Sequence, residues 1–516
     1  MIISLSVLVI TIIVSGTYAL YKAQLSKNIG VNTTTHGLAY YINYVKGTDI
    51  TAATLNPSTS YEGGASSDIE FWKKDDSYDI YGKIELTVNT IGTNLSNSPA
   101  LKYAVVNNGN VLKEGSLKGT TSGSKVTILK NLYLEQTKQI YTVYVWLDNS
   151  EELGNISNES LSISVDCTAS LQKEPTAADT IISLYTSAAK VTATNNSITY
   201  NTAPSVSLMN DRLGGTTTDL DGGNIRYYGA NPNNYIYFNC SDYSNQTSST
   251  CETWRIIGVF DGKLKLIKGS QIGTYSWDNK NTSTGAENNS GKNDWTTARL
   301  MKLLNPVDYY INDNNDKDSE GNYLGYSLYY NSTSGKCYSG KNNATVDCDF
   351  TSTGIKNDET RNMIAETTYN LGGWNTFTVY PNEIYEYERG ITVYTGRLPT
   401  WTGKIALAYP SDYGYAADLN QCVNKQLNKY NDSTCTSNNW MKSIITNNGS
   451  NDGWLLTPHS NYSYIAWGVI LSGIMGGNHA YYSSYGSAPV LYLSSELGIE
   501  SGAGDGSSSN PYKLSA

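Results

Sequence analysis

The sequence lacks the motifs on which most familiar enzymes rely. It contains no HExxH, no GxSxG, no P-loop and no GxGxxG after a predicted strand, which excludes the common motif-bearing zinc proteases, serine hydrolases and nucleotide-binding enzymes. Only three histidines, His36, His459 and His479, occur in 516 residues. A catalytic base would have to come from these three, and a pair of loop histidines is more often without catalytic function. We therefore expect that the protein is not an enzyme.

Positive charge is also scarce. The chain has 36 Lys and Arg against 46 Asp and Glu, a formal net charge of −10, and only 16% charged residues. An acidic chain without a basic stripe lacks the electrostatic footprint of a nucleic-acid-binding protein. Its 39% hydrophobic content argues against intrinsic disorder. Because only one long apolar run occurs, at the start of the chain, a multi-pass membrane protein is excluded.

Phenylalanine is rare while tyrosine is abundant: the chain has 5 Phe and 43 Tyr. Codon bias toward A and T would raise both residue types, so it does not explain this ratio. Tyrosine combines a flat apolar body with a hydroxyl that can stay hydrated. That combination suits half-buried strands and contact surfaces better than dry cores.

The one long apolar run, Met1–Leu20, has the character of an export signal. It closes in small residues, and Thr17 and Ala19 fit the small-x-small pattern that precedes a cleavage point. No Lys or Arg precedes the run, so residues 1–19 are either a cleaved signal peptide or a retained N-terminal anchor. Any membrane contact is expected through this segment alone, and the protein is expected to be extracellular or at the cell surface.

Six of the seven cysteines form three local pairs, and no CxxC occurs. Zinc sites usually take closely spaced Cys or Cys/His ligands, and no histidine lies near these cysteines, so short-range disulfides in an oxidising compartment are favoured. The predicted pairs are Cys240 with Cys251, Cys337 with Cys348, and Cys422 with Cys435. Cys167 is left over, as a buried thiol or an intermolecular link.

Two regions of different character follow. Residues 28–169 contain successive segments of period-two alternation, such as Lys83–Ile91 and Gln139–Leu147, which predict a β-sandwich. Residues 170–220 are expected to be a linker with a short helix that starts near Asp179. Residues 221–516 carry a mixture of strand and helix patterns, including an Asp261-Gly262 hairpin turn, and predict an α+β domain.

The most distinctive segment is Trp454–Leu493. Its two ends read as framework, and its middle is rich in Tyr, Asn, Ser, Gly and Trp. Tyr and Trp provide large contact area at low rotamer cost, whereas Ser, Gly and Asn adapt their hydrogen bonds. The alternative is that these residues only fill irregular loops of a Tyr-rich protein.

The C-terminal region from Asn224, with its NIRYYGANPNNYIYFNC and CETWRIIGVFDGKLKLI segments, resembles an uncharacterised surface-protein domain of gut Firmicutes. Its last part resembles the C-type-lectin-like fold of formylglycine-generating-enzyme type that is used by the variable proteins of diversity-generating retroelements. In that family, one motif precedes and another follows the segment that forms the binding surface. Trp454-x-Leu456-x-Pro458 resembles the first motif and Gly486–Pro489 resembles the second, although Ala488 stands where the family has arginine.

This resemblance implies a set of ligand-facing positions between the two brackets. They are Asn461, Tyr462, Tyr464, Trp467, Ile470, Asn478, His479, Tyr481, Tyr482 and Tyr485. It does not imply formylglycine-generating activity, because no matching catalytic cysteine pair is present.

The N-terminal region, through SGTYALYKA and the strand pattern QIYTVYVWLD, resembles the TasA/camelysin group of secreted Firmicutes proteins. That resemblance implies a β-sandwich that takes part in extracellular matrix fibres. Zinc-protease activity is not indicated, because His36 is the only histidine of the region.

We therefore expect a secreted or surface-held, adhesin-like protein that consists of a mainly β N-terminal sandwich and an α+β, C-type-lectin-like C-terminal domain. Its partner would be a protein or glycan on a host, phage or neighbouring-cell surface, and the sandwich could also self-assemble. One alternative is a structural matrix or fibre protein without a specific ligand.

A second alternative is a carbohydrate-active enzyme. If NEIYEYERG is a strand, Glu386 and Glu388 share one face and their mutual repulsion could raise a pKa; on a solvated edge or a helix end they have no such role. No cofactor is expected beyond a weak Ca²⁺ signal at Asp316, Asp318 and Glu320, where the loop lacks its completing acid.

Overall fold

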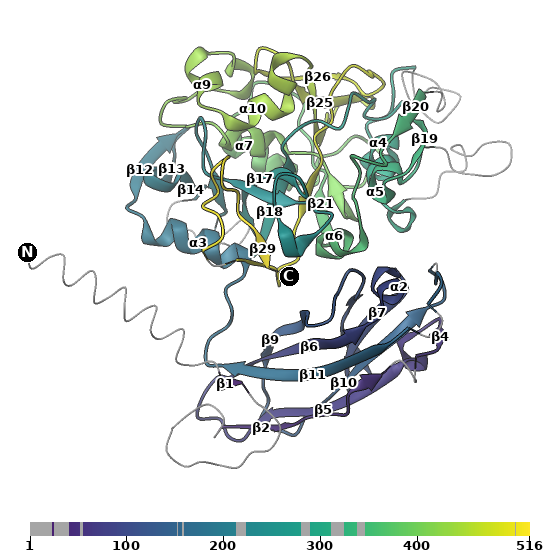
Figure 1. Cartoon of the computed structure of the whole chain (residues 1–516). Helices are drawn as coiled ribbons and strands as arrows, with labels where there is room; N and C mark the ends of the chain where they lie inside the picture. The colour runs from purple at the N-terminus through teal and green to yellow at the C-terminus, as the bar shows by residue number, and fades with distance from the viewer. Residues whose placement is uncertain are drawn as a thin grey trace, which may run out of the picture. The chain divides into compact units, whose positions relative to one another are not determined.

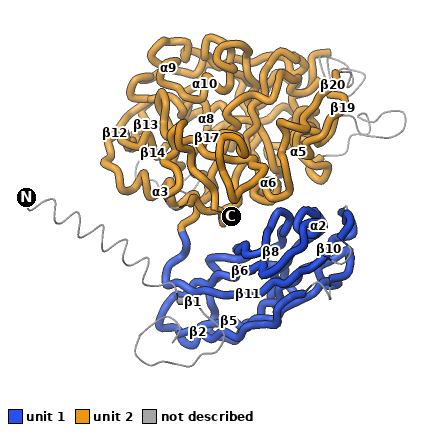
Figure 2. The backbone as a smooth tube through the Cα atoms, viewed as in Figure 1, with its two compact units in different colours: residues 1–174 blue, residues 175–516 orange. Residues whose placement is uncertain are grey.

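The computed structural model describes most of the chain, and all structural statements concern the described residues. These are residues 23–24, 41–51, 55–151, 153–156, 159–212, 223–279, 289–310, 325–337, 346–500 and 502–515. The protein is rich in β-structure, with 37% strand and 18% helix. Two compact units divide the chain, residues 1–174 and residues 175–516 (Figure 2). The expected signal segment 1–19, His36 and the acidic loop with Asp316, Asp318 and Glu320 lie outside the described residues.

Unit 1 contains two antiparallel sheets (Figure 1). The first has the order β1 (Ala23–Gln24), β11 (Leu161–Ser170), β6 (Tyr81–Ile91), β9 (Lys125–Tyr133), and β3 (Ile50–Thr51) also pairs with β11. The second has the order β2 (Ile42–Val45), β5 (Ala65–Lys73), β10 (Ile140–Asp148), β7 (Leu101–Asn107), β8 (Asn110–Ser116), and β4 (Pro57–Ser58) adds a parallel pair to β10. One short helix, α2 (Thr93–Asn97), follows β6.

The two sheets share one hydrophobic core, so the unit has a β-sandwich-like architecture. Strand β6 alternates regularly between half-buried and buried positions, and its Ile84, Leu86 and Val88 are fully buried. Phe71 and Val143 of the other sheet belong to the same cluster. The alternation arises because successive side chains of a strand point to opposite faces. This two-sheet arrangement fits the expected β-sandwich, whereas the bounds 28–169 stay a prediction.

Residues 170–220, which were predicted to be a linker, mostly belong to unit 2. The boundary between the units falls after Glu174, and the short helix is present as α3 (Ala177–Ser187), capped by Thr176 in a capping box with Asp179. After it, β12 (Val191–Asn195), β13 (Ile198–Ala203) and β14 (Leu208–Asn210) join the main sheet of unit 2. The sequence suggested a linker because β12, at the edge of the sheet, and its neighbour β13 carry mostly polar residues at their exposed and half-buried positions.

Unit 2 is built on a nine-stranded sheet. Its order is β12, β13, β14, β15 (Ile225–Tyr227), β17 (Glu252–Phe260), β18 (Lys263–Lys268), β27 (Val490–Tyr492), β23 (Ile405–Ala406), and β16 (Tyr235–Phe238) also pairs with β17. The predicted turn between β17 and β18 is present, with positive φ values of 48° at Asp261 and 70° at Gly262. Such values at both central residues are those that a two-residue hairpin turn requires.

The rest of unit 2 consists of short elements around this sheet. The helices are α4 (Arg299–Leu304), α5 (Leu328–Asn331), α6 (Asp358–Met363), α7 (Pro381–Glu388), α8 (Pro410–Tyr415), α9 (Ser433–Ser437) and α10 (Trp440–Ile445). The additional antiparallel strands are β19 (Ser334–Cys337) with β20 (Val346–Asp349), β21 (Thr367–Asn370) with β22 (Thr400–Gly403), the three strands β24 (Gly453–Pro458), β25 (Ile465–Val469) and β26 (Met475–His479), and β28 (Gly498–Ile499) with β29 (Leu514–Ser515).

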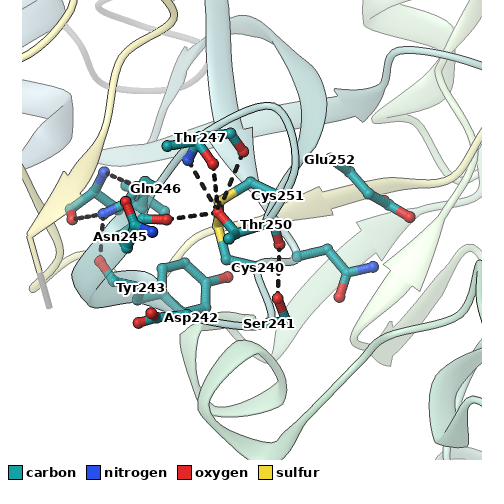
Figure 3. The surroundings of a disulfide bond; sticks show 12 residues. Cys240, Ser241, Asp242, Tyr243, Asn245, Gln246, Thr247, Thr250, Cys251 and Glu252 are labelled. Carbon is teal, nitrogen blue, oxygen red and sulfur yellow. Dashed lines mark hydrogen bonds between the residues drawn. A yellow bond between two sulfur atoms is a disulfide. The ribbon is translucent and has the colours of Figure 1, made fainter.

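The three predicted disulfides are present. Cys240 and Cys251 are joined, as are Cys337 with Cys348 and Cys422 with Cys435. Figure 3 shows the first of them beside a loop in which the Thr250 hydroxyl donates to the carbonyl of Asn245. Three such bonds suggest an oxidising environment. The leftover Cys167 is buried in unit 1.

Within the described ranges, no helix has the length and apolar character needed to cross a membrane.

The sandwich core makes a direct prediction about stability. Leu86→Ala should lower the free energy of unfolding of unit 1 by about 2–5 kcal/mol, because it removes a fully buried side chain and leaves a cavity. Thr90→Ala, on an exposed position of the same strand, should change it far less. Urea unfolding followed by circular dichroism measures both. Equal losses for the two variants would contradict the assigned packing.

Candidate functional site

The Tyr-rich segment forms a small antiparallel sheet of β24, β25 and β26, in that order. Trp454 ties this sheet to another segment of unit 2, and Trp467 donates a hydrogen bond within the sheet. The indole nitrogen of Trp454 donates to the carbonyl of Tyr275 at 2.8 Å, and that of Trp467 donates to the carbonyl of Pro458 at 3.2 Å. Both side chains are fully buried. The expected framework role of the segment's beginning is thus visible in its contacts.

One end of this sheet carries a cluster of aromatic rings, here called the aromatic row. Its members are Tyr462, Tyr464, His479, Tyr481 and Tyr482. Ring centroids lie 5.8 Å apart for Tyr462 and Tyr464, 4.9 Å for Tyr464 and His479, and 5.9 Å for His479 and each of the last two. Tyr481 and Tyr482 stack at 4.7 Å. The pairing of Ile465 with His479 brings the two loops together.

The aromatic row is accessible at its two ends. Tyr462 is 48% exposed and Tyr482 is 38% exposed, whereas Tyr464, His479 and Tyr481 are half-buried between them. Asn461 beside Tyr462 is also exposed. Half-buried rings already have part of their rotamer freedom restricted, so a ligand would order few additional groups on binding.

A neighbouring segment fixes the backbone beneath the row. The side-chain amide nitrogen of Asn293 lies 3.0, 2.7 and 2.9 Å from the carbonyl oxygens of His459, Tyr462 and Ile465. Gly291 has φ of +91°, and a Cβ there would lie 2.7 Å from the backbone nitrogen of Tyr481. The loops are therefore positioned through backbone atoms and close approach, not through their exposed side chains.

His459 lies beneath the row and is 3% exposed. Its Nδ1 accepts a hydrogen bond from the backbone N–H of Asn461 at 3.1 Å, so this nitrogen carries no proton. Burial lowers the pKa of His459, against a smaller opposing effect of a backbone hydrogen bond with Asn375. Ring contacts through Tyr462 and Tyr464 separate His459 from His479. The buried, neutral imidazole of His459 has a structural role in this loop.

Several of the implied ligand-facing residues are placed elsewhere. Trp467 and Tyr485 are buried, and Tyr485 stacks on Trp454 with centroids 4.1 Å apart. Asn478 uses its amide to donate to the hydroxyl of Tyr485 at 3.0 Å. Ile470 lies in the turn at the other end of the β25–β26 hairpin. These four residues lie outside the aromatic row: two are buried in the core, Asn478 is engaged with Tyr485, and Ile470 lies at the opposite end of the hairpin.

Sequence reasoning missed the neighbours of the row. Phe377 packs edge-to-face on Trp467, with centroids 4.6 Å apart. Arg397 donates to the carbonyl of Ser463, and the N–H of Gly373 donates to the carbonyl of Thr392 at 2.8 Å. The exposed segment that contains Ile391, which is 84% exposed, is thereby held next to the loop that carries Tyr462. No local pattern marks these contacts, since they join segments far apart in the sequence.

The strand that would place Glu386 and Glu388 on one face is absent, and the alternative of a helix end is the one present. The segment is helix α7, which begins at Pro381, and Glu383 caps it by accepting from the N–H of Tyr380. Glu386 is exposed, whereas Glu388 is fully buried and accepts from the backbone and hydroxyl of Ser411. The two carboxyls do not share a face, so this pair gives no glycosidase arrangement. A proline at the first helical position was the available signal.

Among the described residues, no group of three or more His, Cys, Asp or Glu side chains is placed to hold a metal ion.

Comparison with known proteins adds little. No protein-family model and no curated protein matches the chain. A solved structure titled as the crystal structure of an HCR/D mutant is similar at 12% identity, over 51% of this chain and 76% of that chain, with a TM-score of 0.14. A likeness of this strength carries no argument about fold or function.

Trp467 offers a first test of the site. Trp467→Ala should lower the free energy of unfolding of unit 2 by about 3–5 kcal/mol, because the indole is buried and hydrogen-bonded. Tyr482→Ala, at an exposed position of the same surface, should change it by less than about 1 kcal/mol. Denaturant unfolding of both variants measures these changes in the free energy of unfolding. If Trp467→Ala proves as stable as the original chain, the buried placement is wrong.

His459 offers a test with pH. The unfolded chain takes up a proton near pH 6.5, and the folded chain does so only at lower pH because the pKa of His459 is lowered. At this group the unfolded state binds more protons as the pH falls below about 6.5, so the contribution of His459 to stability should fall from pH 7 to 5. Glu388, whose pKa is raised to about 7 by burial, contributes in the opposite sense over the same range. The stability of the original chain relative to His459→Gln should therefore fall from pH 7 to 5, since glutamine can accept from Asn461 without titrating. Chemical unfolding at several pH values measures it, and identical slopes would contradict the assignment.

Proposed function

We propose that this chain is a secreted or cell-surface, adhesin-like recognition protein, which binds a protein or glycan ligand through the aromatic row of unit 2. The observation that carries the proposal is the row itself: five aromatic rings in mutual contact, accessible at both ends and held on a rigid backbone. Tyrosines of this kind dominate the energetics of many recognition surfaces.

The surroundings of the row favour a protein partner. The aliphatic side chains of Ile391 and Leu398 are 84% and 51% exposed, and the contacts of Gly373 and Arg397 hold their segment beside the row. Exposed aliphatic groups beside tyrosines supply the apolar area of a protein interface. They offer sugar hydroxyls neither a stacking face nor a hydrogen bond.

The finer architecture is part of the same proposal. We infer that unit 2 is C-type-lectin-like and that unit 1, with its TasA-like sequence features, acts as a stalk or assembly module for it. The three disulfides support an extracellular location, because such bonds persist in oxidising compartments.

The accessible tyrosines test the function. On arrays of surface proteins and glycans, the full chain should bind a protein ligand, and Tyr462→Ala or Tyr482→Ala should each weaken that binding by about 2 kcal/mol, or roughly thirtyfold in Kd. The melting temperature should change little, because neither side chain belongs to the buried core.

Tyr78→Ala provides the matched control, since Tyr78 is 45% exposed in unit 1. Its binding should equal that of the original chain. Unchanged binding in the two row variants, equal losses in the control, or no ligand on either array would contradict the proposal. Binding confined to the glycan array would contradict the choice of a protein partner.

A further inference from the structure

A lysine and an aspartate that are not part of the aromatic row meet in the interior of unit 2. The Nζ of Lys265 on β18 lies 2.5 Å from the Oδ2 of Asp412 on α8, and both side chains are essentially inaccessible to solvent. They are 147 positions apart in the chain. The pair therefore connects the central sheet to a helix across a long stretch of sequence.

Aromatic rings enclose the lysine. Its Nζ lies 5.1 Å from the ring centre of Phe260, 4.3 Å from that of Tyr409 and 5.4 Å from that of Tyr492. In this apolar surrounding the charged form is poorly solvated, and burial lowers the pKa of Lys265 to about 8 although Asp412 opposes the shift. At neutral pH the uncharged, nucleophilic form of the amine is therefore more populated than in an ordinary lysine.

The other carboxylate oxygen of Asp412 is held by a fixed cation. Oδ1 accepts from Nη1 of Arg226 at 3.1 Å, and Nε of Arg226 donates to Asp211 at 2.6 Å. The cation keeps Asp412 ionised at rest, and the pKa of Asp412 is lowered by Lys265 and Arg226 despite burial. If the carboxyl carbon were attacked, the same guanidinium would stabilise the negative charge that develops on Oδ1.

A buried carboxyl hydrogen-bonds to the residue that precedes Asp412, and Asp412 acts on it electrostatically. Glu388 is fully buried and accepts from the backbone N–H of Ser411 at 2.9 Å and from its hydroxyl, and Ser411 directly precedes Asp412. Burial raises the pKa of Glu388 to about 7, although Arg389, with Nη1 3.4 Å from its carboxyl, opposes this. Around neutral pH a substantial share of Glu388 is an uncharged acid.

We propose that Lys265 and Asp412 condense into an intramolecular amide, an isopeptide bond, with Glu388 as proton relay. One proton passes from the ammonium to Oδ2, the amine attacks the carboxyl carbon, and the C–N bond forms. The bond from that carbon to Oδ2 then breaks, and Oδ2 leaves as water with a second proton from the nitrogen, which Glu388 transfers. Nothing is oxidised or reduced.

The driving force lies in the burial of the pair. Two charges held away from water carry a desolvation cost that their attraction does not fully offset. Condensation removes both charges, whereas Arg226 keeps Asp211 as its counter-ion and its hydrogen bond to the remaining oxygen. The product would be a covalent link between β18 and α8 that resists reduction, unlike the three disulfides.

Mass spectrometry of the full chain tests the bond. After denaturation and reduction, the protein should be about 18 Da lighter than its sequence requires, the mass of one water. Trypsin should fail to cleave after Lys265 and should release residues 264–268 joined to residues 405–425. A full-length mass without this loss, or a loss located at other residues, would overturn the proposal.

Variants separate the link from folding. Lys265→Arg should abolish the mass loss, and Lys268→Arg should retain it, because Lys268 on the same strand pairs with Glu252 at a less buried site. Glu388→Gln should give folded but unlinked chain, judged by an unchanged circular dichroism spectrum together with the absent mass loss. A Glu388→Gln chain that links as fast as the original would overturn the relay, and a Lys265→Arg chain that keeps the loss would overturn the link.

Discussion

The interior of unit 2 is organised around one carboxylate. Asp412 accepts from the backbone N–H of Tyr409 and so begins helix α8, and it also pairs with Arg226 on β15 and Lys265 on β18. Removal of one partner from such a buried group leaves an uncompensated charge, which typically costs about 3–5 kcal/mol. The placement of α8 on the sheet, and of the β24 strand that packs near it, therefore depends on these few charged contacts.

In the binding surface that we propose, buried and exposed aromatic residues have different roles. Trp454, Trp467 and Tyr485 face the core and fix the sheet, whereas the row stands above them. The excess of tyrosine over phenylalanine has a physical reason in both layers. Buried tyrosines such as Tyr413 and Tyr430 donate their hydroxyls to backbone carbonyls, and exposed ones keep the hydroxyl in water.

The features that the sequence predicted correctly are those that depend on interactions between residues close together in the chain. The β-rich class, the turn at Asp261 and Gly262, and the three short-range disulfides follow from alternation, turn chemistry and spacing. The strands at 191–210 were missed because their sequence is largely polar, although each of them pairs with the next strand along the chain. The resemblance pointed to the segment between Trp454 and Pro489, but only tertiary packing could separate Tyr462 and Tyr482, which are exposed, from Trp467 and Tyr485, which are not.

The way the loops of the row are held bears on how this protein can evolve. The side-chain amide of Asn293 donates to main-chain carbonyls, and the N–H groups of Asp278 and Ala480 donate to the carbonyls of Ala480 and Tyr464. None of these bonds depends on which side chain occupies positions 461, 462 or 482. Exchange of residues there would alter the chemistry of the surface at little cost to folding, so new specificities could arise by substitution while the scaffold remains the same.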